Sequence, residues 1–508
     1  MAEIQFGTDG WRGIIAEDVT FANVRLAARA IARRVRADAA VGGSPHLLVG
    51  YDTRFLSREF ALAAAEAIAS EGLRVSLAEQ FAPTPAFSYA VVRLRAAGAV
   101  VITASHNPPQ YSGVKFKASF GGSAPVSFTR GVEEEIHRIE AETAQRAAGS
   151  GQRAAIELRE VPSAGKGEPR ATSHEPRGEA AQRAAIESFD ARGPWLDRLE
   201  QLVDIARIGR SGIRVVLEVM YGSGQGLLSA RLRRAGCEIR ELHAEINPGF
   251  GGLHPEPIPK NMGALLEAVT GWTGQGIRVG FAFDGDSDRI APVDEGGNVI
   301  SPHQTLALLV RHLARNRKER GTIVKSVNIG RMVDLEAAAL GLPLVVTPIG
   351  FKFIAAAMQE HDALVGGEES GGFAVRGHIP ERDPGLISLL LLECMAMTGK
   401  SLGALVREME AEYGPHRYGR VDLRLATLAD RDRIVASVTT APPSRLLGQP
   451  LRQVDTLDGV KLVRADQSWV MLRASGTEPL LRIYAEARSD AEVESLLAWG
   501  RQYASGKE

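Results

Sequence analysis

The chain has 508 residues, and its 60 Lys and Arg nearly balance 61 Asp and Glu, for a formal net charge of −1 at pH 7. We expect three or four domains from this length, and the neutral balance argues against nucleic-acid binding through a basic surface. The chain has only two cysteines, so no disulfide framework is expected. Its N-terminus does not resemble a signal peptide and it has no long apolar run, so we predict a soluble cytoplasmic protein without a membrane segment.

The first part of the chain is expected to alternate between strands and helices. Apolar runs predict strands at residues 47–51, 74–78 and 99–103, and helices are expected at residues 58–70 and 86–96. Ser57 is the expected N-cap of the first of these helices, and Gly72 marks its end. Strand–helix–strand alternation indicates a parallel sheet that is covered on both faces.

Residues 142–188 interrupt this pattern. They are rich in Ala, Arg, Gly and Glu, and the tetrapeptide Gln-Arg-Ala-Ala occurs in this region three times, beginning at Gln145, Gln152 and Gln182. Such a composition is typical of a low-complexity linker that is mobile or partly helical. We therefore predict a linker between a first domain at residues 1–141 and a second that begins at residue 189.

The alternating pattern returns after the linker. The expected strands are residues 213–219, 279–283, 322–327, 344–347 and 364–365, and the expected helices are residues 227–235, 332–339 and 353–361. In the last part of the chain, the sequence pattern predicts a smaller α+β unit with strands at residues 421–425, 460–464, 469–473 and 481–486. The later domains are accordingly expected at residues 189–298, 299–414 and 415–508.

Polar loops follow several of these strands, where open α/β sheets bind their ligands. The first loop is Thr103-Ala-Ser105-His106-Asn107-Pro108-Pro109, with Lys115 downstream. Its paired prolines stiffen the loop, and Ser105 needs an activating group or an attached phosphoryl group for covalent chemistry. Adjacent Ser and His side chains are not expected to reach each other, which argues against a hydrolase triad. A polar surface turn is the alternative.

The second loop is Asp284-Gly-Asp286-Ser-Asp288-Arg289. Carboxylates at alternate positions of an extended segment point to one side, and three so close together repel strongly without a cation. Oxygen ligands suit a hard cation, and Mg²⁺ is the usual choice beside phosphate. The spacing does not fit an EF-hand, and a plain acidic turn remains the alternative.

The third loop is Gly366-Gly-Glu368-Glu-Ser370-Gly-Gly372. Its Glu and Ser side chains can hydrogen-bond to neighbouring sugar hydroxyls, and the glycines allow close backbone approach. His378 and Arg382 follow at a distance that could return them to the same cleft. Glycine-rich turns are common, so this pattern alone indicates little.

The fourth loop is Arg473-Ala-Ser475-Gly476-Thr477-Glu478-Pro479, with Arg482 on the following strand. Backbone amides, two hydroxyls and two guanidinium groups favour a phosphate clamp, and a β-turn with solvated arginines is the alternative. The segment Gly222-Ser-Gly224-Gln-Gly226 is similar to a dinucleotide fingerprint, but its third glycine comes one residue early. We do not interpret it as a cofactor site.

Together these loops resemble those of the α-D-phosphohexomutase superfamily, the phosphoglucomutases and phosphomannomutases, and most of all a bacterial-type phosphoglucomutase. The resemblance covers the chain except residues 142–188. The motifs that carry it are Phe6-Gly-Thr-Asp-Gly-Trp-Arg-Gly13, Thr103 to Pro109, Asp284 to Arg289, Gly367 to Gly371 and Arg473 to Pro479. It implies an α/β fold of three similar α/β/α domains with mixed, largely parallel sheets plus a smaller C-terminal α+β domain, arranged around one central cleft.

The resemblance also implies a role for each site residue. Ser105 would carry a phosphoryl group, and Asp284, Asp286 and Asp288 would hold Mg²⁺ together with an oxygen of that group. The residues matched to the surroundings of the reacting phosphate are Arg12, His106, Lys115 and Arg289. The residues matched to sugar contacts are Glu368, Ser370, Gly350, Lys352, His378 and Arg382. The residues matched to the distal phosphate clamp are Arg473, Ser475, Gly476, Thr477 and Arg482.

The implied reaction interconverts glucose 1-phosphate and glucose 6-phosphate. Phosphoserine would give its group to the hexose monophosphate, and the glucose 1,6-bisphosphate intermediate, which also serves as activator, would turn end for end. The Glu-Glu-Ser-Gly-Gly sugar loop is closer to glucose-type enzymes than to mannose-active or glucosamine-active relatives. Phosphomannomutase and phosphoglucosamine mutase remain alternatives, as do a Mg²⁺-dependent phosphatase and a non-catalytic sugar-phosphate sensor. A hexose phosphate is the expected partner, with no nucleic acid or membrane, and the chain is expected to be a monomer or a homodimer.

Overall fold

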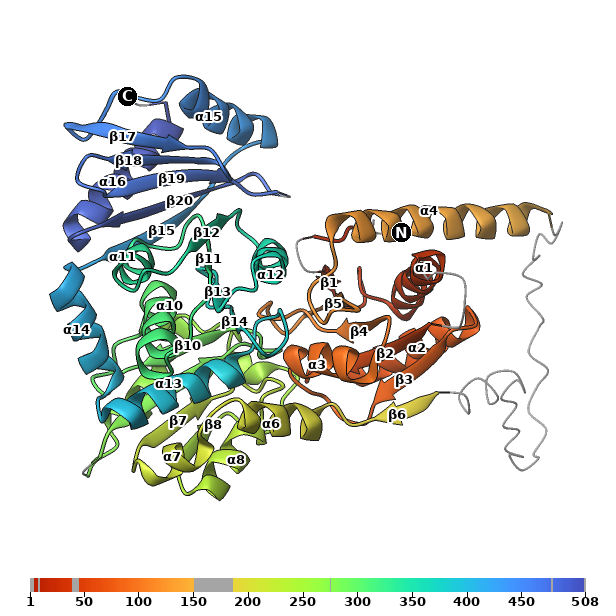
Figure 1. Cartoon of the computed structure of the whole chain (residues 1–508). Coiled ribbons are helices and arrows are strands. Elements are labelled where there is room, and N and C mark those ends of the chain that lie inside the picture. Colours follow the sequence, from red (N-terminus) through yellow and green to blue (C-terminus); the bar gives the residue numbers. More distant parts are fainter. Residues whose placement is uncertain are drawn as a thin grey trace, which may run out of the picture.

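The computed structural model describes residues 4–7, 10–38, 45–149, 186–274, 276–476 and 478–506, with backbone only at 146–149. Four β-sheets follow one another along the chain, each with its own helices (Figure 1). In Figure 1 the first unit lies on the right, the second lies at the lower left with the third above it, and the fourth stands above the third.

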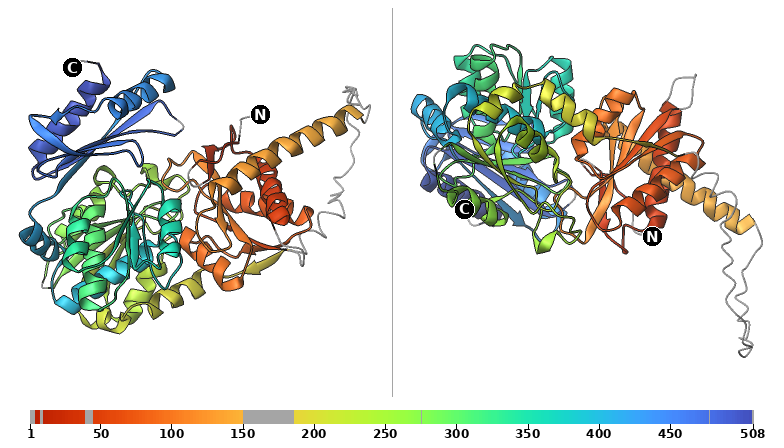
Figure 2. Two further views of the ribbon diagram at one scale, coloured as in Figure 1. Left: turned by 45° about the horizontal axis from the view of Figure 1, so that its top comes forward. Right: turned by 90° about the horizontal axis from the view of Figure 1, so that it is seen from below.

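The first unit is a six-stranded sheet in the order β1-β5-β4-β2-β3-β6. Its strands are β1 (Trp11–Ile14), β2 (His46–Tyr51), β3 (Arg74–Ala78), β4 (Gly98–Ile102), β5 (Tyr111–Ala118) and β6 (Glu187–Phe189), and its helices are α1 (Phe21–Asp38), α2 (Ser57–Ser70), α3 (Thr84–Leu94) and α4 (Val126–Gly149). Neighbours among β4, β2, β3 and β6 pair in parallel, whereas β5 is antiparallel to β4 and β1. Helices cover both faces, and α4 packs along α1 on the outer side (Figure 2).

The second unit has a four-stranded sheet in the order β10-β9-β7-β8. Its elements are α6 (Arg192–Gln201), α7 (Ile205–Arg210), β7 (Arg214–Glu218), α8 (Leu227–Ala235), β8 (Glu238–Leu242), the 3₁₀ turns η1 (Phe250–Gly252) and η2 (Pro259–Asn261), α9 (Gly263–Thr270), β9 (Arg278–Phe283) and β10 (Ile290–Val293). Strands β8, β7 and β9 are parallel, and β10 is antiparallel to β9.

The third unit repeats this plan in the order β12-β11-β13-β14. Its elements are α10 (Pro302–Arg311), the π-helical turn η3 (His312–Asn316), β11 (Ile323–Ser326), α11 (Met332–Ala339), β12 (Leu344–Thr347), α12 (Phe351–Glu360), β13 (Val365–Gly367), β14 (Phe373–Val375), α13 (Pro384–Thr398) and α14 (Leu402–Tyr413). Strands β12, β11 and β13 are parallel, and β14 is antiparallel to β13.

The fourth unit is smaller, and its sheet is antiparallel throughout. Its elements are β15 (Arg417–Arg424), α15 (Leu428–Thr440), β16 (Arg445–Leu446), β17 (Gln449–Asp455), β18 (Val460–Arg464), β19 (Trp469–Ala474), β20 (Leu480–Ala487) and α16 (Asp490–Ala504). One face packs against α15 and α16 around its own core. From the other face Trp469, Met471 and Tyr484 pack with Val327 of the third unit.

The predicted fold class is confirmed: three α/β/α units with mixed, largely parallel sheets precede a smaller α+β unit. Several bounds also agree, among them those of α8, α11, β12 and β18. Strand β6 was not foreseen, because three residues in low-complexity surroundings carry little pattern. It lies partly within residues 142–188 and joins the first sheet beside β3. Helix α4 also continues past residue 141, and residues 150–185 of the predicted linker lie outside the described part of the chain.

The prediction of Ser57 as an N-cap is wrong. Leu56 occupies the cap position with a φ of 58°, and Ser57 is the first helical residue of α2. The Ser57 hydroxyl donates instead to Asp52 Oδ1 at 2.7 Å, so a tertiary partner takes the group that the local pattern reserves for the helix end. Gly72 does follow the helix, with a φ of 81°, in the left-handed region that glycine adopts without strain.

No single helix among the described residues is long and apolar enough to cross a membrane. In the described part of the chain, one pair of helices, α13 and α14, together reaches the length and composition of a span, and the two meet at a bend of 78°. Residues 384–395 of α13 are all buried within the fold, which accounts for the apolar run at residues 389–392.

The four units share one feature that positions a site. In each, a strand turns directly into an antiparallel partner, at the connections β4–β5, β9–β10, β13–β14 and β19–β20. The four polar loops of the sequence are these four connections. They meet in the middle of the molecule and bring their side chains to one cleft.

Candidate active site

A cleft of about 820 Å³ lies between the four units. Most of the residues that the sequence singles out line its wall: Arg12, His106, Arg289, Gly350, Lys352, Glu368, Ser370, Arg382, Arg473, Ser475, Gly476 and Arg482. Ser105, Lys115 and the three aspartates are buried beside it, each no more than 1% exposed. Thr477 lies outside the described residues.

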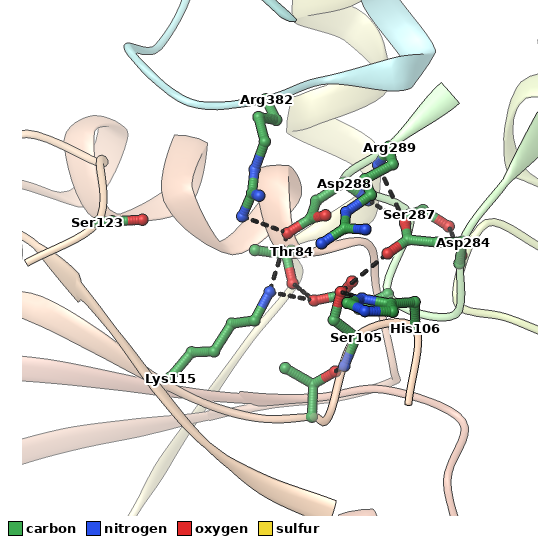
Figure 3. A network of polar contacts seen from close by, with 12 residues as sticks. Thr84, Ser105, His106, Lys115, Ser123, Asp284, Ser287, Asp288, Arg289 and Arg382 are labelled. Atoms are coloured by element: carbon green, nitrogen blue, oxygen red, sulfur yellow. Dashed lines mark hydrogen bonds and ion pairs between the residues drawn. The ribbon is translucent and has the colours of Figure 1, made fainter. Parts of the chain in front are cut away.

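Ser105 lies in the β4–β5 connection, in contact with the second unit. Its hydroxyl donates to Asp284 Oδ2 at 2.9 Å, and its amide donates to Thr103 Oγ1 at 2.9 Å (Figure 3). Its φ of 51° is left-handed, a conformation that costs a residue with a side chain some strain. His106 Nδ1 lies 3.4 Å from the same hydroxyl, so the adjacent pair does come within long hydrogen-bond range, contrary to expectation.

Arg54, which is not among the residues predicted from the sequence, holds this loop in place. Its guanidinium is buried and donates to four carbonyl oxygens, those of Ser105 and Asn107 at 2.6 Å and those of Pro108 and Tyr111 at 2.9 Å. It also lies over the ring of Phe250 in the second unit, 4.9 Å from the centroid. The signal that could have found it is its place directly after a predicted strand, like the other polar loops.

The three aspartates come from the β9–β10 connection, and their ligand atoms lie within 4.8 Å of one another. Asp284 Oδ1 accepts the amides of Asp288 and Arg289, which turns Oδ2 toward Ser105. The amide of Ser223 donates to Gly285 O at 2.9 Å. The glycine-rich segment that contains Ser223 thus supports the aspartate loop, and a Cβ at Gly222 would lie 2.7 Å from Gly285 O.

Two side chains of the first unit neutralise and orient the aspartates. Lys115 Nζ donates to Asp286 Oδ2 at 2.7 Å and to Asp288 Oδ2 at 2.9 Å (Figure 3). Thr84, the first residue of α3, donates its hydroxyl to Asp286 Oδ2 at 2.7 Å, and its amide donates to Asp286 O at 2.9 Å. No local sequence pattern marks Thr84, because its partner is distant in the chain.

The donor set fits a hard divalent cation. Three carboxylates provide oxygen ligands only, as Mg²⁺ prefers, and Asp286 Oδ1 is buried with no hydrogen-bond partner among the described residues. Burial and the neighbouring Asp288 and Asp286 raise the pKa of Asp284 well above its ordinary value. Burial alone would also raise the pKa of Asp286, but Lys115 lowers it. A cation between the three would remove the repulsion that Asp284 experiences.

His106 lies on the cleft wall with its charge suppressed. Burial, followed by the nearby guanidinium groups of Arg289 and Arg12, lowers the pKa of His106 well below its ordinary value. Arg12 is itself held by Asn107: Arg12 Nη1 donates a hydrogen bond to Asn107 Oδ1 at 2.8 Å. A neutral imidazole beside a hydroxyl can accept a proton.

The sugar loop lies opposite, in the β13–β14 connection. Ser370 donates to Glu368 Oε1 at 2.6 Å, and both side chains line the cleft. Arg382 reaches both Glu368 and Asp288, with Nη2 2.7 Å from Asp288 Oδ2. His378 is not in the cleft wall: it is buried, 2.9 Å from Asp383 Oδ2, and stacks on Tyr89.

The distal end of the cleft carries the arginines of the fourth unit. Arg473 and Arg482 are directly opposite one another on β19 and β20, and both line the cleft. Arg473 Nε donates to Asp458 Oδ2 at 2.9 Å, whereas Arg482 Nε is buried with no partner among the described residues. Ser475 and Gly476 follow in the turn. The arrangement offers a cationic end to an anion.

Two further arginines of this unit are functional-site candidates that were not predicted from the sequence. Arg431 of α15 donates to the carbonyl oxygens of Ser475 and Glu478 and so holds the turn from behind. Arg420 of β15 lines the cleft, and its Nη1 lies 3.7 Å from Glu369 Oε2 of the sugar loop. Neither has a local signal, because each contacts a loop far away in the chain.

Comparison with known proteins gives a consistent result along the whole chain. Models of phosphoglucomutase/phosphomannomutase α/β/α domains I, II and III match residues 3–143, 193–297 and 301–413, and the model of the C-terminal domain matches residues 425–498. A phosphoglucomutase/phosphomannomutase of Thermococcus kodakarensis is 29% identical over 97% of each chain. A phosphoglucosamine mutase of Rubrobacter xylanophilus is 30% identical, over 97% of this chain and 94% of that protein.

Solved structures give the same picture. The crystal structure of a protein described as a candidate phosphomannomutase from Thermus thermophilus is 36% identical, with a TM-score of 0.79, over 99% of this chain and 100% of that one. The similar proteins therefore carry different substrate names. Their similarity extends over the whole chain but leaves the sugar open.

Proposed function

The chain belongs to the phosphoglucomutase/phosphomannomutase family of mutases, and from that membership we propose that it interconverts glucose 1-phosphate and glucose 6-phosphate. Ser105 would carry a phosphoryl group in the resting enzyme. The observation that carries the proposal is that one cleft has a serine 2.9 Å from a three-aspartate cluster at one end and paired arginines at the other. A mutase needs both, because its bisphosphate intermediate has a reacting and a distal phosphate.

In the proposed first step, the free hydroxyl of the hexose monophosphate attacks the phosphorus of phosphoserine. The bond from phosphorus to Ser105 Oγ breaks, a bond to the sugar oxygen forms, and the proton of the sugar hydroxyl passes to a base. Neutral His106, whose Nδ1 lies 3.4 Å from Ser105 Oγ, would accept this proton and pass it to the departing Oγ. Lys115 would contribute positive charge beside the transferring group. The products are glucose 1,6-bisphosphate and Ser105 without its phosphoryl group.

In the second step the bisphosphate has turned end for end, and its other phosphoryl group returns to Ser105. Arg473, Ser475, Gly476, Thr477 and Arg482 would hold whichever phosphate is distal, and Glu368 and Ser370 would hold sugar hydroxyls in both orientations. Gly350 and Lys352 lie on the same wall. Positioning and charge neutralisation would supply most of the rate.

Mg²⁺ is the proposed metal, held by Asp284, Asp286 and Asp288 with a phosphoserine oxygen. When bound, it would neutralise charge on the transferring phosphoryl group. The chain's own residues prepare the site: Lys115 and Thr84 fix Asp286, the amides of Asp288 and Arg289 fix Asp284, and Arg289 presents its guanidinium to the cleft.

Turnover of glucose 1-phosphate to glucose 6-phosphate, with Mg²⁺ and a trace of glucose 1,6-bisphosphate, tests the proposal. Mannose and glucosamine phosphates are assayed beside it, and Ser105→Ala is the control. We expect turnover that favours glucose and disappears in the variant. Preference for another sugar would keep the reaction and reject our interpretation of the Glu368 loop. Full activity of the variant, or no turnover of any sugar, would reject the phosphoserine mechanism.

A Mg²⁺-dependent phosphatase is a second candidate for a serine beside a metal site. It needs one phosphate site only, so the arginine pair at the distal end argues against it. Replacing Arg473 and Arg482 by Gln should raise KM for the hexose phosphate so far that most mutase turnover is lost at ordinary substrate concentrations. The same variant should leave hydrolysis of a simple ester such as p-nitrophenyl phosphate unchanged if the chain is a phosphatase.

A further inference from the structure

A buried ion pair joins the first and third units beside the cleft. Lys117 of β5 places Nζ 2.7 Å from Glu381 Oε2, and neither side chain has any exposed surface. Ser123, which lines the cleft, donates to the same carboxylate oxygen at 3.1 Å. Glu381 belongs to the segment between β14 and α13. The pair therefore connects two units that are far apart in the chain.

The second oxygen of the same carboxylate holds the next residue. Glu381 Oε1 accepts the amide of Arg382 at 3.1 Å and lies 3.4 Å from its Nε. One carboxylate thus binds Lys117 on one side and Arg382 on the other. Because Glu381 cannot rotate without losing Lys117, the position of Arg382 depends on the ion pair.

Arg382 is the link between the metal loop and the sugar loop. Its Nη2 donates to Asp288 Oδ2 at 2.7 Å, and its Nη1 lies 3.4 Å from Glu368 Oε1. Figure 3 shows its side chain extending toward Asp288, on the opposite side of the aspartates from Ser105. The side chain is 6% exposed, and its guanidinium lies over the ring of Phe351. The fork of a guanidinium suits it to hold two carboxylates at a fixed separation.

A pair this deeply buried needs a reason other than stability. Removing two charges from water costs about as much as their attraction returns, so apolar residues of similar size would serve the interface equally well. The pair nevertheless lies next to Arg382, whose guanidinium has to be oriented toward Asp288 and Glu368. Outer partners of this kind orient the groups that do the chemistry.

We propose that Lys117 and Glu381 are positioning residues that fix Arg382, and through it the separation of the Asp288 and Glu368 carboxylates. This inference rests on the proposed function, because that separation would set where the sugar hydroxyls lie relative to the transferring phosphoryl group. The pair acts on the reaction only through Arg382. Neither of its members touches the substrate.

The test is a double-mutant cycle between the pair and Arg382. A single change such as Lys117→Met leaves a buried charge alone and is expected to impair folding, so the pair is removed as a unit in Lys117→Met/Glu381→Met. We expect kcat/KM for the preferred hexose phosphate to fall about 10–100-fold, the usual effect of losing an outer partner. In Arg382→Met alone, kcat/KM should fall at least as far. Adding Arg382→Met to the pair variant should lower kcat/KM little further.

Two further variants separate positioning from packing. Lys117→Met/Glu381→Gln keeps an acceptor for the Arg382 amide and should recover part of the lost activity. Arg311→Met/Glu336→Met removes a comparably buried pair between α10 and α11, away from the cleft, and should lower stability with little change in kcat/KM. Full activity of Lys117→Met/Glu381→Met would overturn the proposal. So would a triple variant whose loss in kcat/KM equals the product of the losses caused by the pair change and by Arg382→Met.

The outcome can be told apart from failure of the proposed function. If the wild-type chain turns over no hexose phosphate, the mutase proposal fails. The same cycle is then read by urea unfolding, where coupling between the pair and Arg382 should appear as non-additive changes in the free energy of unfolding. Additive changes in that measurement would reject the positioning role independently.

Discussion

The two ends of the cleft are built differently. At the reacting end, Ser105, Asp284 and Asp286 are buried, and hydrogen bonds between the first and second units connect them through Lys115 and Thr84. At the distal end, Gly476 and Glu478 are exposed, and the contacts that hold their turn come from within the fourth unit, from Arg431 and Asp458.

This difference matches the tasks proposed for the two ends. Phosphoryl transfer depends on positioning within a fraction of an ångström, which a cross-connected, buried cluster provides. The distal end has to accept a phosphate from either orientation of the intermediate, so it relies on charge and on a turn held from one side. Changes at the reacting end should therefore lower kcat, and changes at the distal end should mainly raise KM.

The largest effect is expected from Asp284→Asn. It removes a proposed metal ligand and the charge that accepts the Ser105 hydroxyl, so kcat should fall by about 10²–10³-fold or more. Steady-state kinetics over a range of Mg²⁺ concentrations measure it. Asp294→Asn is the matched control, because Asp294 is a buried carboxylate of the same unit that caps the turn at Asn298. Equal losses in both variants would mean that the effect is structural.

Arg54→Met should have the next largest effect. It releases four carbonyl oxygens of the Ser105 loop while Ser105 itself is unchanged, and a displacement of about 1 Å at the reacting atom costs about 10²-fold in kcat. Arg240→Met, which removes an exposed arginine stacked on Trp272, is the control. Kinetics like those of the wild type in a folded Arg54 variant would show that the loop does not need this support.

A smaller effect, of another kind, is expected from Arg431→Met. Loss of its two carbonyl contacts loosens the distal turn, so KM should rise by about tenfold with kcat nearly unchanged. Arg433→Met, on the same helix but paired only with Asp430 on the surface, should change neither constant. A fall in kcat that exceeds the rise in KM would contradict the expectation that the distal end acts mainly on KM.

The smallest effect on turnover is expected from Glu486→Gln, which acts on the junction of the third and fourth units. Glu486 accepts the Arg331 amide and contacts His416, and although burial alone would raise its pKa, these partners lower it to about 2. Stabilisation by a carboxylate with a lowered pKa is present above its ordinary pKa and is lost as the pH falls toward 2. The lowered pKa of Glu486 corresponds to about 3 kcal/mol of stabilisation at pH 7.

Urea unfolding of the wild type and of Glu486→Gln at several pH values checks this expectation. The difference in the free energy of unfolding between the two proteins should be largest at pH 7 and should shrink between about pH 4.5 and pH 2. A difference that stays constant with pH would mean that the Glu486 charge does not stabilise the junction. Turnover at pH 7 should change by less than about threefold, because the residue lies outside the cleft wall.

The sequence predicts much of this molecule because its signals are local. Apolar runs such as residues 99–102 mark buried strands, and each polar loop directly follows a strand, so fold class and loops could be found together. The aspartate spacing is also local, and the three side chains do face one another.

What the sequence missed is non-local. Arg54 and Thr84 act on residues about 50 and 200 positions away, and no pattern near either residue indicates the partner. The contacts of His378, which lies outside the cleft wall, are non-local too: its ring contacts Asp383, and Asp383 also accepts a hydrogen bond from Trp195 of the second unit. Strand β6 is too short to be recognised without its partner β3.

The proposed reaction depends most directly on a phosphoryl group carried by Ser105. Mass spectrometry of a proteolytic digest, after incubation with glucose 1,6-bisphosphate and Mg²⁺ and removal of the sugar, measures it directly. We predict one phosphate on the peptide that contains Ser105, lost when excess glucose 6-phosphate is added without bisphosphate to recharge the enzyme, and absent from Ser105→Ala. An unmodified Ser105 in protein that is turning over substrate would contradict this role, and so would a phosphate on Ser105 that excess glucose 6-phosphate does not remove.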